Sequence, residues 1–101
     1  MAATIIHNSR EQCFVLEWQG QQARLEYQLQ PAVGHVPPQV NFNHTYLPPE
    51  LRGQGLAEQL VQFGLLWASQ QNLHVVASCW YVAKIMSVNA AADADRVNKN
   101  V

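Results

Sequence analysis

A pair of glycines, Gly53 and Gly55, stands where a strand-like segment gives way to a strongly helical one. This junction constrains the fold more than any other feature of the chain. Glycines there allow the backbone to come close to a bound group and to point its amides at it. The start of a helix also carries partial positive charge, so the junction suits phosphate. Arg52 at this positive end is unfavourable by itself, and a bound anion would remove that conflict.

Alternation of apolar and polar residues predicts the strands that precede this junction. Residues 12–19 and 22–30 alternate on either side of Gly20-Gln21, which we interpret as the turn of a β-hairpin. A short β-prone segment at residues 3–7 comes before the hairpin, and residues 39–47 form another alternating strand. One face of that last strand is expected to carry Val40, Phe42, His44 and Tyr46.

After the junction, the periodicity changes to that of a helix. Residues 53–71 are predicted to be helical, and Asn72 can end that helix in a left-handed conformation. Residues 74–79 are predicted to form a buried strand, and residues 81–89 a second helix. The expected packing stripe of the first helix is Leu56, Leu60, Phe63, Gly64 and Trp67. The order of elements predicts an α/β fold with a parallel β-α-β unit, whose ligand lies near the carboxyl ends of its strands.

Length and composition favour one domain over residues 1–101, with a core at about 10–88 and a tail at 90–101. Hydrophobic residues make up 49% and charged residues 13%, which argues against disorder.

The net charge of −1 leaves no basic stripe for nucleic acid, and no apolar stretch reaches the length of a membrane span. The scattered histidines and cysteines predict no metal site. We expect a cytoplasmic protein with free thiols, and the low charge and exposed hairpin edge are compatible with a homodimer.

Three motifs follow one another in order along the chain. The first is His44-Thr45-Tyr46-Leu47-Pro48, the second is Arg52-Gly53-Gln54-Gly55-Leu56-Ala57, and the third is Cys79-Trp80-Tyr81-Val82. Together with a hairpin that carries Glu26-Tyr27, they make residues 10–88 resemble the small members of the Gcn5-related N-acetyltransferases. The resemblance implies a mixed sheet, with antiparallel N-terminal strands followed by the β-α-β unit and with helices packed on it. It also implies acetyl-CoA as cofactor.

The same resemblance implies where acetyl-CoA would bind. Its pyrophosphate would lie on the amides of Gln54, Gly55, Leu56 and Ala57, beside Arg52 and Gly53. Its pantetheine arm would pair with the backbone of Thr45, Tyr46 and Leu47, and its thioester would lie near His44 and Cys79. Larger members of the family extend further along the chain and often use a glutamate on a central strand as general base. Residues 39–47 contain no carboxylate, so the resemblance does not assign the acceptor or the base.

Each residue with a candidate catalytic role also has a structural interpretation. His44 could take a proton from an amine or a thiol, or could be a partly buried, hydrogen-bonded histidine. Cys79 could accept the acetyl group in a relay with His44, or could be a small core residue. Tyr81 could protonate the departing CoA thiolate, or could pack a helix against the sheet. Trp67 and Trp80 are expected as core or interface anchors, and the remaining histidines on the surface or in loops: His7, His35 and His74.

Three functions are compatible with these observations. The first is an acetyltransferase that moves acetyl from acetyl-CoA to an amine on a small molecule or a protein. The second is a module that binds CoA with little or no catalysis and acts through a protein partner. The third is a small α/β interaction domain that binds no CoA.

Overall fold

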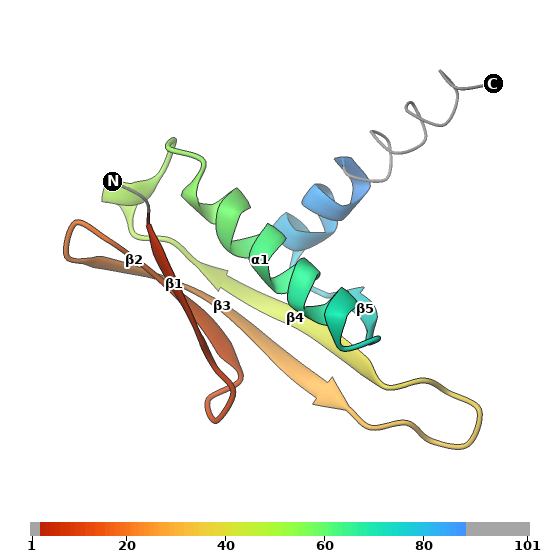
Figure 1. Ribbon diagram of the computed structural model, residues 1–101. Coiled ribbons are helices and arrows are strands. Elements are labelled where there is room, and N and C mark those ends of the chain that lie inside the picture. Colours follow the sequence, from red (N-terminus) through yellow and green to blue (C-terminus); the bar gives the residue numbers. More distant parts are fainter. Residues whose placement is uncertain (1–2, 89–101) are drawn as a thin grey trace, which may run out of the picture.

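The computed structural model describes residues 3–88 of the 101-residue chain (Figure 1). Its strands form one sheet in which each strand lies beside the next one along the chain. In chain order they are β1 (Thr4–Asn8), β2 (Cys13–Trp18), β3 (Gln21–Gln30), β4 (Gln39–Tyr46) and β5 (His74–Ala77). Neighbours from β1 to β4 are antiparallel, whereas β4 and β5 are parallel. The predicted α/β fold with a mixed sheet is therefore confirmed.

Two helices complete the described chain. After a 3₁₀ turn at Pro49–Leu51, the helix α1 spans Leu56–Gln70 and lies against one face of the sheet (Figure 1). A second helix begins at residue 80 and is described to residue 88. The predicted tail at residues 90–101 lies outside the described residues. None of the helices within residues 3–88 is long and apolar enough to cross a bilayer.

The core lies between the sheet and the two helices. From the sheet it takes Phe14, Leu16, Ala23, Leu25, Tyr27, Val40 and Phe42, and from the helices mainly Leu56, Leu60, Val61, Ala68, Val82 and Ile85. The predicted stripe of α1 holds at Leu56, Leu60 and Gly64, but Phe63 is 40% exposed. Because the second helix joins the same core, the buried stripe of α1 broadens to include Ala57, Val61 and Ala68.

Several predicted boundaries move by a few residues. The hairpin turn is Gln19-Gly20 rather than Gly20-Gln21, because Trp18 already pairs with Gln21. Both turn residues have positive φ, 52° and 76°, which suits the right-handed twist of the two strands. Asn72 does end α1 in the left-handed region, with φ of 56°.

The strand β5 differs from its prediction as a buried strand. Its residues alternate between exposed and half-buried, because within residues 3–88 it pairs with β4 alone. Trp80, which follows it, is 74% exposed and is therefore not a core anchor. Trp67, by contrast, packs against the core as predicted.

A β-bulge interrupts β4 and changes which of its residues face α1. Tyr27 pairs with Phe42, but Glu26 pairs with His44, so Asn43 is an extra residue on β4. Val40 and Phe42 are buried beneath α1, whereas His44 and Tyr46 are exposed. Thr45 instead takes the inward position opposite the buried Leu25. The prediction that Val40, Phe42, His44 and Tyr46 share one face is therefore wrong beyond the bulge.

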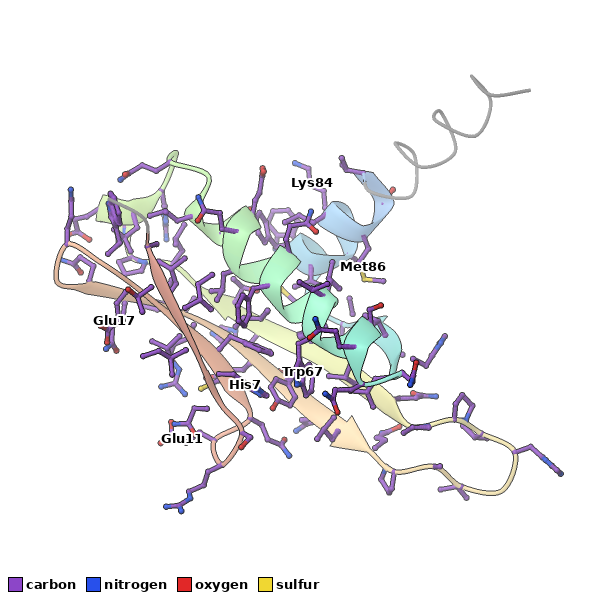
Figure 2. All side chains as sticks on the ribbon, in the orientation of Figure 1. His7, Glu11, Glu17, Trp67, Lys84 and Met86 are labelled. Carbon is purple, nitrogen blue, oxygen red and sulfur yellow. The ribbon has the colours of Figure 1, made fainter. Side chains whose placement is uncertain are left out.

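His7 is also placed differently from its prediction as a surface or loop residue. On β1 it is half-buried and points toward Trp67 of α1 (Figure 2). Its ring stacks on Phe14 with centroids 4.3 Å apart. A histidine in this position contributes to the aromatic part of the core, as a small hydrophobic ring with one polar edge.

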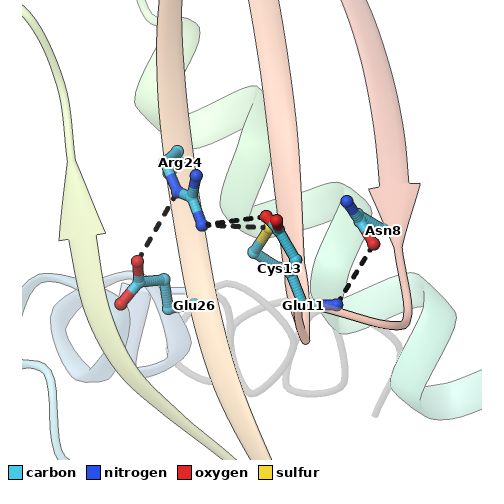
Figure 3. A network of polar contacts seen from close by, with 5 residues as sticks. All are labelled: Asn8, Glu11, Cys13, Arg24 and Glu26. Carbon is cyan, nitrogen blue, oxygen red and sulfur yellow. Dashed lines mark hydrogen bonds and ion pairs between the residues drawn. The ribbon is translucent and has the colours of Figure 1, made fainter.

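The opposite face of the sheet carries a polar cluster over Cys13 (Figure 3). The Arg24 guanidinium lies 3.6 Å from a Glu11 carboxylate oxygen and 3.5 Å from one of Glu26, and it donates a hydrogen bond to Cys13 Sγ. Burial raises the pKa of the Cys13 thiol, and no part of its surface is exposed. Cys13 is accordingly a structural, protonated thiol.

Candidate functional site

The strands β4 and β5 pair over only part of their length. Gln39–Phe42 lie beside His74–Ala77, and the Cys79 amide then donates to the Phe42 carbonyl at 3.2 Å. Beyond that bond, residues 43–46 of β4 have no strand partner on this side within residues 3–88. The two strands therefore leave a gap between them, with part of the β4 backbone open along its edge.

The glycine junction lies at the end of this gap. Gly53 and Gly55 have φ of 78° and 74°, a conformation that side chains other than glycine rarely adopt. The helix consequently begins at Leu56 rather than at Gly53, and its first hydrogen bond runs from the Gln59 amide to the Gly55 carbonyl. Within the described part of the chain, the amides of residues 53–58 make no hydrogen bond. This row of free donors at the positive end of a helix is suited to an anion.

A cavity of about 500 Å³ joins the gap, the glycine junction and the second helix. Among the predicted cofactor residues, it is lined by Thr45, Leu47, Arg52, Gly53, Gly55, Leu56 and Ala57. Cys79 and Tyr81, two of the predicted catalytic residues, also line it. The structure thus brings most of the predicted site residues to one place.

Three predicted site residues do not line the cavity. Tyr46 pairs with Arg24 on β3, and the Gln54 side chain donates to the Glu50 carbonyl at 3.1 Å. His44 pairs with Glu26 and is exposed on the sheet face opposite α1, because the bulge at Asn43 turns it outward. The predicted pairing of His44 with Cys79 inside one pocket is not found.

The Cys79 thiol is surrounded by hydrogen-bond donors. Its Sγ lies 3.5 Å from the hydroxyl oxygen of Thr45, and the second helix begins at the next residue. Burial raises the pKa of the Cys79 thiol, but hydrogen bonds from the Thr45 hydroxyl and from the amides of Val82, Tyr81 and Thr45 outweigh this, so the pKa lies below its ordinary value. Thiolate character is therefore favoured at Cys79 and disfavoured at the buried Cys13.

The pKa of Tyr81 is shifted in the opposite direction, upward from its ordinary value. Burial raises the pKa of its hydroxyl, and the negative charge of Glu58 raises it further. Tyr81 therefore stays protonated at neutral pH and can donate a proton inside the cavity.

A backbone carbonyl of the preceding segment positions the Arg52 side chain at the edge of the cavity. Its Nε donates to the Leu47 carbonyl at 3.4 Å, and its guanidinium makes no ion pair with any described residue. The positive charge is thus free to meet an anion at the glycine junction.

Three residues that line the cavity were not predicted as site residues: Leu51, Glu58 and Trp80. Glu58 follows Gly55 by three residues, and residues at that spacing share one side of a helix, so the helical periodicity could have placed it there. Trp80 lies in the third motif, but an aromatic residue after a strand is equally consistent with a core position, and the sequence therefore did not assign it to the site. Within residues 3–88, no group of three or more His, Cys, Asp or Glu side chains could hold a metal ion.

Comparison with known proteins matches residues 13–95 to a family described as GCN5-related N-acetyl-transferase. Among individual proteins, the chain is 32% identical over 50 residues to Protein NATD1 of Bos taurus and of Homo sapiens. It is 30% identical over 50 residues to Protein NATD1 of Xenopus tropicalis. Each match covers 50% of this chain, and 44% to 46% of the relative.

Proposed function

Because the chain belongs to the Gcn5-related N-acetyltransferase family, we propose that it binds acetyl-CoA and transfers the acetyl group to an amine. One observation carries this proposal. The open edge of β4, the free amides of residues 53–58 and the Cys79 thiol all meet at one cavity of about 500 Å³. A cavity of this size is within the range that binds small molecules and cofactors.

In this proposal the pyrophosphate of acetyl-CoA lies on the glycine junction. The amides from Gly53 to Glu58 donate to its oxygens, and Arg52 adds a compensating charge. The pantetheine arm follows the unpaired edge of β4, where the Thr45 amide already points across the gap toward Cys79. This arrangement puts the thioester near Cys79 and Tyr81.

Two routes for the acetyl group fit this site. In direct transfer, the amine nitrogen attacks the thioester carbonyl carbon, the C–S bond breaks, and the CoA thiolate takes a proton from Tyr81. The amine loses a proton to a base. If His44 is that base, the amine reaches the thioester from the opposite face of the sheet, through the gap between β4 and β5.

In the relay route, the Cys79 thiolate attacks the thioester carbonyl first. The acetyl group passes to Sγ, the C–S bond to CoA breaks, and the CoA thiolate takes a proton from Tyr81. The amine then attacks the acetyl-cysteine and gives its proton to the tyrosinate of Tyr81. This second attack restores the Cys79 thiolate and releases the acetylated amine. The lowered pKa of Cys79 supports this route, because it favours the attacking thiolate.

The position of His44 favours a second candidate function, a CoA-binding module with little catalysis. His44 lies outside the cavity, and β4 provides no carboxylate as a base. The chain also spans less than half the length of the relatives that it matches, so the activity of a whole relative is not carried over to it.

Calorimetric titration with acetyl-CoA tests the binding that both functions share. Gly55→Glu places bulk and negative charge at the phosphate position, and binding should be lost. Gly20→Glu is a matched control, because Gly20 has φ of 76°, close to the 74° of Gly55, and both sites leave open space for a Cβ. The two variants should carry similar backbone strain, and only Gly55→Glu should lose acetyl-CoA.

Enzyme and module then differ in the release of free thiol. An enzyme releases CoA thiol from acetyl-CoA when an amine is present, and Cys79→Ala slows this release if the relay operates. A module binds acetyl-CoA with equal affinity in wild type and Cys79→Ala and releases no thiol above background. No binding by the wild type would contradict both functions and leave the interaction domain.

A further inference from the structure

The bulge at Asn43 decides which side chain of β4 meets Cys79. Without an extra residue, the alternation that begins at Val40 and Phe42 would continue and point His44 toward α1. With it, Thr45 takes the inward position opposite Leu25, and His44 faces the other side. Bulges are known to re-aim side chains next to functional sites.

Thr45 reaches Cys79 twice, once with its side chain and once with its backbone. Its hydroxyl oxygen lies 3.5 Å from Sγ, a distance at which sulfur still accepts a hydrogen bond. Its amide points to the same sulfur across the gap between β4 and β5. The side chain is half-buried and lines the cavity with Cys79.

The donors around Cys79 come from two sides. Thr45 approaches from β4, while the amides of Tyr81 and Val82 approach from the first turn of the second helix. A thiolate has no proton to give, so the Thr45 hydroxyl must be the donor when Cys79 is ionised. If Cys79 were a thiol that donated to Thr45, the same contact would favour the protonated form instead.

We infer that Thr45 is the positioning residue of Cys79: its hydroxyl donates a hydrogen bond that holds the thiolate toward the cavity. The inference rests on the proposed function, because it gives this thiolate a place beside the thioester. In this inference, the Thr45 hydroxyl and the amides of Thr45, Tyr81 and Val82 are the partners of the Cys79 thiol, a position for which the sequence offered His44 as one candidate. The competing interpretation is that Thr45 only packs its methyl group against the core.

Alkylation of the free protein by iodoacetamide separates the two interpretations, with each cysteine followed by mass spectrometry. Thr45→Val keeps the branched shape and removes the hydroxyl. Alkylation of Cys79 should then be roughly tenfold slower at neutral pH, and its pH profile should move to higher pH. Thr45→Ser should restore the wild-type profile, because it returns the hydroxyl without the methyl group.

Two controls keep the measurement interpretable. Cys13 is fully buried, so its alkylation reports unfolding in the same sample. Thr4→Val makes the same change at an exposed position of β1 and should leave the Cys79 profile unaltered. If Thr45→Val exposes Cys13, Thr45→Ala provides the same comparison with less bulk.

An unchanged pH profile in a folded Thr45→Val or Thr45→Ala protein would overturn the inference. A Thr45→Ser protein as slow as Thr45→Val would also overturn it, because the methyl group would then be what matters. The labelling uses no acetyl-CoA, so its result is independent of cofactor binding. Failure of the proposed function would appear instead in the calorimetric titration or in the release of free thiol.

Discussion

The imidazole Nε2 of His7 lies 2.6 Å from the hydroxyl oxygen of Tyr27, and this hydrogen bond joins β1 to β3 across β2. Trp67 of α1 closes the cluster, with its ring 4.8 Å from His7 and 5.0 Å from Tyr27 between centroids. The edge strand β1 is thereby attached to the helix layer as well as to the sheet. One titratable ring thus contributes to the attachment of the first strand.

Stability should consequently depend on the protonation of His7. Burial lowers the pKa of His7, so the unfolded chain binds a proton more readily than the folded protein. This difference in proton binding has no effect on stability well above the unfolded-state pKa of His7. As pH falls through that pKa and below, it lowers the free energy of unfolding. The melting temperature, followed by circular dichroism, should fall between about pH 7.5 and about pH 5.5.

The variant His7→Gln separates this effect from other titrations. It keeps a polar group near Tyr27 but carries no titratable ring, so the fall in melting temperature should be smaller. His35→Gln removes an exposed loop histidine and should keep the wild-type slope. Equal slopes in wild type and His7→Gln would show that His7 does not carry the pH dependence.

Gly64 allows α1 to approach the sheet closely. A Cβ at this position would lie 2.9 Å from Leu25 Cδ2 and 3.1 Å from the Phe42 ring, and both side chains are fully buried. Gly64→Ala should therefore lower the free energy of unfolding by about 1 kcal/mol, because overpacking outweighs the better helix propensity of alanine. Urea denaturation measures this change.

Ser69→Ala provides the comparison for Gly64→Ala on the same helix. Ser69 is exposed, so alanine gains helix propensity there without a steric cost, and stability should stay equal or rise slightly. If Gly64→Ala were as stable as Ser69→Ala, the close packing of α1 on Leu25 and Phe42 would not limit the side chain at residue 64.

The order of elements and the glycine junction could be predicted because both depend on local signals. Strand alternation and helical periodicity appear directly in the sequence, and Gly53 and Gly55 mark a backbone conformation that few other residues adopt. The cavity, which brings Thr45, Arg52 and Cys79 together, follows from these elements once the β-α-β unit forms.

The bulge and the place of His7 could not be predicted in this way. Val40, Phe42, His44 and Tyr46 continue an apparently regular alternation, and only the pairing of β4 with β3 makes Asn43 an extra residue. A bulge depends on the partner strand, which lies elsewhere in the sequence. Similarly, His7 enters the core because Phe14, Tyr27 and Trp67 surround it in three dimensions.

Asn41 holds the segment before Cys79 in place. Its Oδ1 accepts hydrogen bonds from the amide and from the hydroxyl of Ser78, both at 3.0 Å. Asn41→Ala should lower the free energy of unfolding by about 1 kcal/mol. Asn41→Asp keeps the acceptor oxygen and should therefore lose much less stability than Asn41→Ala. Asn43→Ala should cost less in urea denaturation, since Asn43 Oδ1 has no hydrogen-bond partner within residues 3–88. Equal losses at the two positions would contradict a specific role for the Ser78 contacts.

Tyr81 should matter for turnover and not for binding of acetyl-CoA. Burial and the charge of Glu58 raise the pKa of its hydroxyl, which keeps a proton available for the departing CoA thiolate. Tyr81→Phe keeps the ring and removes that proton, so the rate of thiol release should fall about 100-fold. The dissociation constant of acetyl-CoA should stay the same.

Tyr46→Phe is the control for Tyr81→Phe. It removes a hydroxyl from a side chain that is 51% exposed and lies outside the cavity, and it should change neither the rate of thiol release nor the dissociation constant. A wild-type rate in Tyr81→Phe would mean that another donor protonates the thiolate, whereas weaker binding would make Tyr81 a contact of the cofactor.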